Sequence, residues 1–367
     1  MKRRQALGLL GGALASVVSQ NTFGQYVIPK GQVRLVFNEN PYGPSPRALA
    51  AVNEILSLSA YYPDSPTDSP ILDDLLSAIS KKHNVDRENL LVSSGSNEAL
   101  QAALLVYGEK GKILAPTLTY DAHLNYAKAL GIDVVNVPLR SDLQVDLDAM
   151  KAQVDHTVSL VYLANPNNPT GLPINATALR NFCREVGKKA VVIIDEAYNE
   201  LTENPADQSM VDLVRDNQNV LITRTFSKIF GMAGMRVGYG LGHPEIIAKV
   251  NNALMAWPNG IGLTAAYHSY QDEEFIAFSR KKILQGRAMV IGTLQRAGVT
   301  PIASQTNFVF ADIGLNATEF VAQMARRDVQ IQGGYQDYPT YIRISMGKLE
   351  DLEIFDRVFS AVYQSYA

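Results

Sequence analysis

Short apolar runs rich in β-branched residues alternate with helical patterns along most of this chain. Seven such runs occupy residues 90–92, 112–114, 134–137, 160–163, 191–194, 220–223 and 237–241. Parallel strands need long crossover connections, which are usually helices, so the alternation predicts an α/β fold with a mostly parallel seven-stranded sheet and helices on both faces. The ligand of such a sheet binds beyond the carboxyl ends of its strands.

The residues after 271 follow a different pattern. A long, charged helical pattern begins at Asp272, and two further strands are expected at 307–312 and 341–345. This order suits a smaller α+β domain. We therefore predict a large domain over residues 48–271, a small domain over 272–367, and an N-terminal arm over 26–47 that joins the small domain.

Composition narrows the class of protein further. The net charge is −3, whereas proteins that bind nucleic acids usually have a basic surface, so the charge does not indicate a nucleic-acid partner. Cys183 is the only cysteine, so no intrachain disulfide can form. The five histidines lack the spacing of metal ligands, and we expect no metal site.

The first 25 residues have the order of an export signal. Lys2, Arg3 and Arg4 precede an uncharged stretch whose apolar centre covers residues 6–18. This centre is shorter than the roughly 20 residues that a membrane-spanning helix needs. The adjacent arginines and the glycine-rich apolar stretch favour export through the twin-arginine machinery to the periplasm. The alternative is an irregular basic N-terminus on a cytoplasmic protein.

Polar residues follow three consecutive strands of the predicted sheet. The motif ANPNNPTG covers residues 164–171, DEAY covers 195–198, and TRTFSKIFGMAGMRVG covers 223–238. Carboxyl ends of parallel strands meet at one edge of a sheet, so we expect the three motifs to form a single site.

The residue types at this edge match the chemistry of pyridoxal phosphate. A lysine can hold the aldehyde of this cofactor as a Schiff base, and Lys228 is the candidate. Asp195 would keep the pyridine nitrogen protonated, so that the ring can accept electrons from the substrate. Tyr198 and Asn168 would hydrogen-bond the ring oxygen O3′.

A second group of residues suits the phosphate of the same cofactor. An arginine can bind a phosphate with two parallel hydrogen bonds, and small hydroxyl groups can add further donors. In SSGSNEAL, over residues 93–100, a glycine lets the chain turn into a helix whose first amides favour an anion. The candidate phosphate ligands are Gly95, Ser96, Asn97, Thr225, Ser227 and Arg236.

The motifs resemble those of fold-type I, pyridoxal-phosphate-dependent aminotransferases of classes I and II. The resemblance rests on NPTG, DEAY, SK with an arginine eight residues later, and RISMG, and it covers nearly all of the chain after the leader. NENPYGPSP, over 38–46, and YYPD, over 61–64, are similar to the histidinol-phosphate aminotransferase-like group. The resemblance implies a homodimer with shared active sites and a ping-pong transfer of an amino group from an amino acid or amine to a 2-oxo acid.

The resemblance also implies roles for individual residues. Lys228, Asp195 and Tyr198 would be catalytic. Tyr120 would stack on the cofactor ring, and Tyr62 of the neighbouring subunit would help to hold its phosphate. Substrate would be bound by Tyr42, Asn168 and Arg343, with Arg343 on the α-carboxylate.

Other activities and substrates stay open at the level of sequence. The same residues could run a decarboxylation or an elimination, as in the similar threonine-phosphate decarboxylases, and a less favoured alternative is a non-catalytic cofactor-binding protein. Family members that use histidinol phosphate carry an arginine shortly before a GGY-like turn, where this chain has Gln330 and Gln332. An uncharged amide cannot match a guanidinium against a phosphate dianion. We therefore expect a substrate other than histidinol phosphate.

Overall fold

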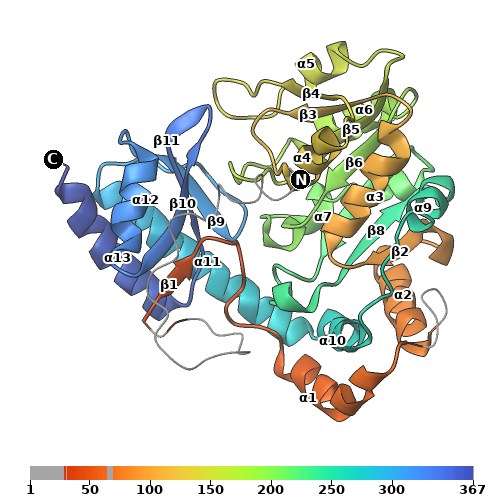
Figure 1. The fold of residues 1–367 in the computed structure, drawn as a ribbon, viewed down its shortest axis with the longest axis horizontal. Helices are drawn as coiled ribbons and strands as arrows, with labels where there is room; N and C mark the ends of the chain where they lie inside the picture. The colour runs from red at the N-terminus through yellow and green to blue at the C-terminus, as the bar shows by residue number, and fades with distance from the viewer. Residues whose placement is uncertain (1–28, 30, 64–68, 367) are drawn as a thin grey trace, which may run out of the picture. The chain divides into compact units, whose positions relative to one another are not determined.

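The larger of the two sheets is the predicted one. The computed structural model describes residues 29, 31–63 and 69–366, so the predicted export signal and Asp64 lie outside the described residues. Seven strands lie in the order β2 (Leu90–Ser93), β8 (Gly238–Gly242), β7 (Val220–Thr225), β6 (Val191–Asp195), β5 (Val158–Ala164), β3 (Lys112–Pro116) and β4 (Val134–Val137) (Figure 1). Only β8 among them runs antiparallel to its neighbours. The predicted mostly parallel seven-stranded sheet is confirmed.

Successive strand residues pack on opposite faces of this sheet. Val191 and Ile193 of β6 belong to one apolar cluster, whereas Val192 and Ile194 belong to the other. All of β6 is buried, as expected for a central parallel strand covered on both sides.

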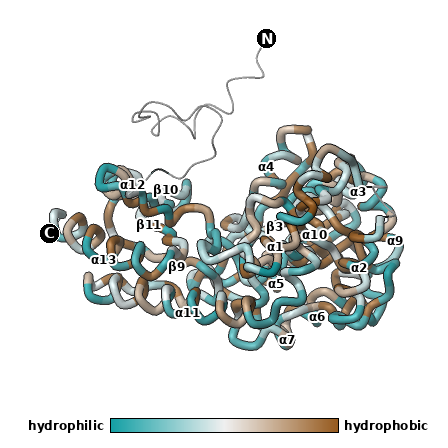
Figure 2. The backbone as a smooth tube through the Cα atoms, turned by 90° about the horizontal axis from the view of Figure 1, so that it is seen from below, coloured by the Kyte–Doolittle hydropathy of each residue, from teal (hydrophilic) through white to brown (hydrophobic). Residues whose placement is uncertain are grey.

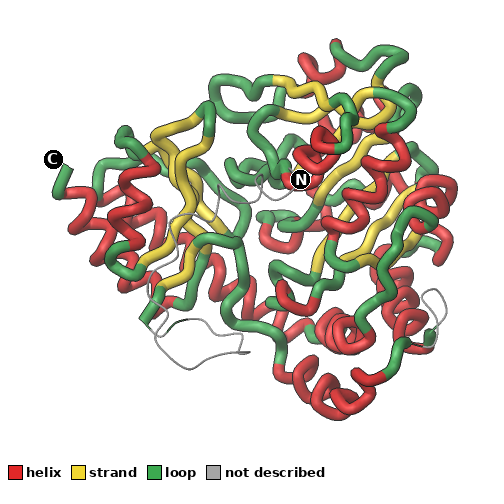
Figure 3. The backbone as a smooth tube through the Cα atoms, viewed as in Figure 1, coloured by secondary structure: helices red, strands yellow, loops and turns green. Residues whose placement is uncertain are grey.

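Secondary structure along the chain is drawn in Figure 3, with strands in yellow and helices in red.

Helices cover both faces of the sheet, as predicted. One cluster takes in apolar residues of α3 (Ser96–Gly108), α4 (Ala122–Ala129) and α9 (Pro244–Asn251). The other takes in residues of α1 (Pro46–Ile55), α2 (Pro70–His83), α5 (Leu147–Ala152), α6 (Ala176–Val186), α8 (Val211–Arg215) and α10 (Gly260–Tyr270). Shorter elements are η1 (Leu56–Ala60), η2 (Arg87–Asn89), η3 (Asn199–Leu201), α7 (Pro205–Gln208) and η4 (Ala233–Met235). The single cysteine, Cys183, is buried on α6.

A second, four-stranded sheet is built from both ends of the described chain. Its order is β1 (Val33–Leu35), β10 (Val329–Tyr335), β11 (Tyr338–Ser345) and β9 (Phe308–Asp312), and β1 pairs with β10 in parallel. The helices of this region are α11 (Glu273–Arg296), α12 (Ala317–Ala325) and α13 (Leu349–Gln364). The exact domain boundaries within the chain stay a prediction.

The helices of this region are amphipathic. Along α13, brown apolar and teal hydrophilic stretches alternate in Figure 2, and its buried residues are Leu352, Phe355, Phe359 and Val362. This spacing of three and four residues places the four side chains on one helical face, which packs into the core. No helix within the described residues is both long and apolar enough to cross a membrane.

Candidate active site

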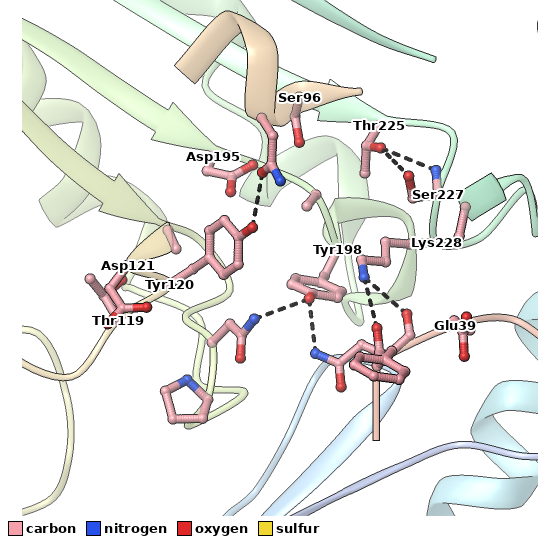
Figure 4. A pocket seen from close by; sticks show the side chains of 18 of the residues that line it. Glu39, Ser96, Thr119, Tyr120, Asp121, Asp195, Tyr198, Thr225, Ser227 and Lys228 are labelled. Atoms are coloured by element: carbon pink, nitrogen blue, oxygen red, sulfur yellow. Dashed lines mark hydrogen bonds between the residues drawn. The ribbon is translucent and has the colours of Figure 1, made fainter. Parts of the chain in front are cut away.

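The loops after β5, β6 and β7 line a pocket of about 480 Å³. Because β5, β6 and β7 are neighbours in the sheet, their carboxyl ends deliver the three predicted motifs to the same place. The pocket also receives Glu39 from the chain before α1 (Figure 4), and Gln332, Tyr335 and Arg343 from the smaller sheet. The predicted site residues that line it are Ser96, Asn97, Tyr120, Asn168, Asp195, Tyr198, Thr225, Ser227, Lys228, Arg236 and Arg343.

The amine of Lys228 binds its proton less tightly than an ordinary lysine does. Its Nζ donates hydrogen bonds to the main-chain carbonyls of Asn38, at 3.0 Å, and Phe37, at 3.4 Å. Burial and the nearby charge of Arg343 lower the pKa of Lys228 from its ordinary 10.5 to about 8. The amine is therefore neutral, and nucleophilic, in a far larger fraction than that of a solvated lysine.

Asp195 ends β6 as a buried carboxylate. It accepts hydrogen bonds from the hydroxyls of Thr223, at 3.1 Å, and Tyr162, at 3.4 Å. Burial raises the pKa of Asp195 to about 6, although these donors and the charge of Lys228 oppose the rise. Within the described chain this carboxylate forms no salt bridge, so a cationic ligand group would be favoured beside it.

Tyr198 offers one free hydrogen-bond donor. Its oxygen accepts from the side-chain amides of Asn38, at 3.1 Å, and Asn168, at 3.3 Å. These two bonds use both lone pairs of the phenol oxygen, so its own hydrogen is left for a ligand. Burial raises the pKa of Tyr198, which keeps that hydrogen in place at all physiological pH values.

Hydroxyl and guanidinium groups gather opposite the start of α3. The Ser227 hydroxyl accepts from Thr225 Oγ1, at 2.9 Å, and from Arg236 Nη1, at 3.4 Å, which leaves its hydrogen free to donate. No side chain caps α3, so the amides of Ser96 and Asn97 at its first turn are available to an anion.

Gly95 shapes this anion site without lining the pocket. Its φ of +76° is a conformation that favours glycine, and a Cβ atom there would collide with the guanidinium of Arg236. The absence of a side chain thus lets Arg236 lie against the turn that begins α3.

Arg343 crosses from the smaller sheet into the pocket. Its Nη1 donates to Asn168 Oδ1 and its Nη2 to the carbonyl of Val36, both at 2.8 Å. The guanidinium lies over the ring of Phe308, 5.5 Å from its centroid. Its Nε has no partner among the described residues, so the guanidinium is fixed in position and retains donor capacity.

Tyr120 forms one wall of the pocket. Its hydroxyl donates to Asn97 Oδ1 at 3.0 Å, and its ring stacks on that of His123 with centroids 5.7 Å apart. A ring held on one face by histidine and at its edge by a hydrogen bond presents its other face to the pocket.

Besides Gly95, the predicted residues Tyr42 and Tyr62 do not line this pocket, and the prediction for Tyr62 concerns the pocket of the neighbouring subunit. The Tyr42 hydroxyl instead accepts from the amide of Leu349, at the start of α13, at 3.1 Å. Tyr62 is 79% exposed and lies beside Trp257, with ring centroids 5.0 Å apart. Of the two glutamines on β10, Gln332 lines the pocket and Gln330 does not.

Sequence reasoning missed several residues of the site. Tyr162 lies inside an apolar strand pattern and gave no signal, whereas Thr223, which also binds the Asp195 carboxylate, begins the lysine motif but was not assigned a role. Asn38 and Glu39 lie in the NENPYGPSP motif, which could have pointed to them. The pocket-lining residues that were not predicted include Phe37, Asn38, Glu39, Thr119, Asp121 and Tyr335.

The donors and acceptors of the pocket fit pyridoxal phosphate. The buried Asp195 carboxylate accepts hydrogen bonds from two hydroxyls and feels the charge of Lys228, and it could face a protonated pyridine nitrogen. The free hydrogens of Tyr198 and Ser227, the uncapped start of α3 and the guanidinium of Arg236 match the oxygen atoms of a phenol and a phosphate.

Known proteins resemble this chain over most of its length. Residues 30–358 match the family described as aminotransferase class I and II. The histidinol-phosphate aminotransferase of Symbiobacterium thermophilum is 34% identical over 332 residues, which cover 90% of each chain. That of Moorella thermoacetica is 32% identical over 337 residues, which cover 91% of this chain and 86% of the relative.

A solved relative shares the fold. The crystal structure of histidinol-phosphate aminotransferase from Sinorhizobium meliloti, in complex with pyridoxal-5'-phosphate, superposes with a TM-score of 0.83 at 27% identity. The match covers 91% of this chain and 92% of that chain. The predicted fold type I is thereby confirmed, as is pyridoxal phosphate as the cofactor. The chain belongs to the class I and II aminotransferases, and it is a pyridoxal-phosphate-dependent enzyme that moves amino groups between amino acids or amines and 2-oxo acids.

Proposed function

We propose that Lys228 is the residue that bonds the cofactor and moves the proton during transamination. The observation that carries this assignment is the position of its amine, which lies in the pocket with a pKa lowered to about 8. Pyridoxal phosphate, when bound, supplies an aldehyde that bonds to amines and a ring that takes up the electron pair of a broken Cα–H bond. Once an incoming amine has released Lys228, its neutral Nζ would take the proton from the substrate Cα and deliver it to the former aldehyde carbon of the cofactor.

The other residues of the pocket would orient the reacting groups. Asp195 would hold a proton on the ring nitrogen, and Tyr198 would donate to the ring hydroxyl oxygen with Asn168 beside it. Arg343 would bind the substrate α-carboxylate through its remaining N–H groups. The phosphate would lie among Ser96, Asn97, Thr225, Ser227 and Arg236, next to the turn at Gly95.

We propose further that the amino donor carries no phosphate, although relatives are named for histidinol phosphate. The cations that line the pocket are Lys228, Arg236 and Arg343, and each already has a role at the cofactor or the α-carboxylate. The same lining contains the carboxylates of Glu39, which is paired with Arg34 at 3.0 Å, and of Asp121, whose negative charge would repel a phosphate dianion. An aromatic, basic or peptide-like amine fits this lining better.

Two measurements test these assignments. Borohydride reduction of the loaded protein, followed by peptide mapping, is expected to label Lys228 and to label nothing in Lys228→Ala. Exposed Lys189 provides the matched control, since Lys189→Ala is expected to retain both label and activity. A label on another peptide of the unaltered enzyme would overturn the assignment.

The second measurement is a panel of amino donors with 2-oxoglutarate as acceptor. Transfer is expected with donors that lack a phosphate, together with a shift of cofactor absorbance to the amine form. A strict requirement for histidinol phosphate would contradict the substrate proposal. Release of carbon dioxide without formation of the matching oxo acid would instead indicate the decarboxylase alternative.

We propose that two copies of the chain form the functional unit, with Tyr62 of each reaching the phosphate of the other. The exposure of Leu56, Leu58, Tyr61, Tyr62 and Trp257 supports this, because an exposed apolar surface of this kind is typical of an interface. Mixing Lys228→Ala with Tyr62→Ala is expected to restore about a quarter of the normal activity, since half of randomly mixed dimers would hold one intact site. Tyr61→Ala in place of Tyr62→Ala is the control, and equal behaviour of the two variants would contradict the role of Tyr62.

We also propose that residues 1–25 direct export by the twin-arginine route to the periplasm. The support is the pair Arg3 and Arg4 ahead of the apolar stretch. Replacing both arginines by lysine, which keeps the charge, is expected to retain the protein in the cytoplasm on cell fractionation. An unaltered protein found only in the cytoplasm would favour the alternative.

A further inference from the structure

A buried phenol donates to the carboxylate that is proposed to face the cofactor ring nitrogen. Tyr162 is fully buried in β5, and its hydroxyl lies 3.4 Å from Asp195 Oδ2. On the other side, Thr223 of β7 donates to Asp195 Oδ1 at 3.1 Å. The two donors thus come from the two strands that flank β6, and they bind different oxygens of one carboxylate.

Strand geometry explains why these three side chains meet. Asp195 and Thr223 are directly opposite each other in the ladder of β6 and β7. Tyr162 is opposite Ile193, two residues before Asp195 on the same strand face, which a tyrosine is long enough to bridge. All three side chains therefore lie on the sheet face that α3 and α4 cover.

His123 fixes the ring of Tyr162 from the side of α4. The two rings meet edge to face, with centroids 4.3 Å apart and an angle of 70° between their planes. Burial lowers the pKa of His123 to about 3, so the imidazole is neutral and adds no charge near Asp195. Neither of its ring nitrogens has a hydrogen-bond partner among the described residues, so it acts on Tyr162 through packing alone.

Besides the two hydroxyls, the main-chain amide of Ala197 and the charge of Lys228 also favour the ionised form of Asp195. Lys228 approaches from the turn after β7, Tyr198 from the turn after β6, and Tyr120 from the loop before α4. Burial raises the pKa of Tyr162 well above its ordinary value, so its hydroxyl stays a donor throughout the working range of pH. A hydrogen bond that favours the charged form of a carboxyl group keeps it ionised to lower pH.

We propose that Tyr162 and Thr223 are positioning residues that together hold the Asp195 carboxylate ionised and oriented toward the ring nitrogen of the cofactor. This inference rests on the proposed role of Asp195. According to this proposal, Tyr162, a tyrosine in the core, influences how strongly the ring nitrogen of the cofactor is protonated. If the phenol were only a packing residue, removal of its oxygen would change stability and nothing else.

The test uses isosteric variants and readouts other than activity. Tyr162→Phe and Thr223→Val each remove one hydroxyl and keep the shape, and Thr223→Ser keeps the hydroxyl as a rescue. Tyr270→Phe is the matched control, because Tyr270 is a buried tyrosine whose hydroxyl meets His83 outside this pocket. Each full-length protein is titrated with pyridoxal phosphate at a series of pH values, and the ¹⁵N shift of ring-labelled cofactor is recorded.

Cofactor affinity is expected to fall as the pH is lowered and Asp195 becomes protonated. In both Tyr162→Phe and Thr223→Val, the midpoint of this fall is expected to lie about half to one pH unit higher than in the unaltered enzyme. In both variants the ring ¹⁵N resonance is expected to move toward the value of unprotonated pyridine. Thr223→Ser and Tyr270→Phe are expected to behave as the unaltered enzyme. Unchanged midpoints and unchanged ¹⁵N shifts in both Tyr162→Phe and Thr223→Val would overturn the inference.

Asp195→Asn separates this inference from the proposal beneath it. If Asp195→Asn leaves the ring ¹⁵N resonance unchanged, the proposed role of Asp195 fails and the inference fails with it. If Asp195→Asn shifts the resonance while Tyr162→Phe and Thr223→Val do not, the role of Asp195 stands and only the inference about its donors is wrong.

Discussion

The amine of Lys228 donates a hydrogen bond to the main-chain carbonyl of Asn38, 3.0 Å away and 190 positions earlier in the chain. Asn38 also donates through its side chain to Tyr198, and it accepts from Ser345 of β11 at 2.7 Å. The segment between β1 and α1 therefore connects the lysine to the smaller sheet. A substrate that binds between Lys228 and Arg343 must contact this segment as well.

The lowered pKa of Lys228 predicts the pH dependence of cofactor attachment. Only the neutral amine attacks an aldehyde, and it becomes abundant as the pH rises through about 8 rather than through the ordinary 10.5. The attachment rate of the cofactor-free protein should therefore rise with pH and level off above about 8. Stopped-flow absorbance measures this rate, with N-acetyl-lysine as the solvated reference. A rate that keeps rising up to the pKa of the reference amine would contradict the prediction.

Asp195→Asn should stabilise the protein when no cofactor is bound. Burial raises the pKa of Asp195 from 3.8 to about 6, so between these values the folded chain holds a proton that the unfolded chain releases. The ionised carboxylate therefore destabilises the fold above pH 6, by up to about 3 kcal/mol, and this cost is absent below pH 3.8.

Urea unfolding of the cofactor-free proteins measures this effect. Asp195→Asn should increase the free energy of unfolding at pH 7.5 and leave it unchanged at pH 3.5. Addition of pyridoxal phosphate should reverse the order at pH 7.5, because the variant loses the charge that favours a protonated ring. Equal stability of the two cofactor-free proteins at pH 7.5 would contradict the raised pKa.

Gly95→Ala should weaken cofactor binding beyond what backbone strain explains. Gly95, with φ of +76° and ψ of 162°, adopts a conformation that is essentially restricted to glycine and costs an alanine about 1–3 kcal/mol, and Gly131, with φ of +84°, is also strained by a side chain. A Cβ atom at Gly95 also collides with the Arg236 guanidinium, whereas one at Gly131 meets nothing within 4 Å. Both variants should lose stability from backbone strain, Gly95→Ala at least as much as Gly131→Ala, and only Gly95→Ala should displace Arg236.

Equilibrium titration with pyridoxal phosphate distinguishes these two glycine variants. The dissociation constant of Gly95→Ala should rise by about tenfold or more, as expected when a charge-assisted hydrogen bond to phosphate is lost. Gly131→Ala should bind the cofactor normally, and equal weakening in both variants would mean that Arg236 plays no part.

Gln332→Arg should introduce use of a phosphorylated amino donor. Gln332 lines the pocket opposite Arg343 on β11, so an arginine there would place a third guanidinium in the lining. The ratio of kcat/KM for histidinol phosphate over that for an unphosphorylated donor should rise by about tenfold or more. Gln330→Arg adds the same charge two residues earlier on β10, outside the lining, and should leave the ratio unchanged. A similar ratio change in both variants would indicate a long-range charge effect instead.

Local sequence patterns were sufficient to predict the parallel sheet and the edge of the sheet at which the site lies. Alternating apolar runs specified a parallel sheet, because strands buried on both faces must be apolar and must be joined by helices. The same logic placed NPTG, DEAY and the lysine motif at one edge, and neighbouring β5, β6 and β7 bear this out. Motifs near in sequence to a strand end are positioned by that strand, so their common location follows from strand order alone.

Only the tertiary structure decided which distant side chains touch. Tyr162 and Thr223 lie within strand patterns, and the hydroxyl of Tyr42, a predicted substrate ligand, accepts a hydrogen bond from the amide of Leu349 at the start of α13. Gln330 and Gln332 share one face of β10, and only their positions along the strand decide that Gln332 lines the pocket and Gln330 does not. These contacts depend on how strands pair and on which way each side chain points, because a sheet brings together residues that are far apart in the chain. No local pattern carries that information.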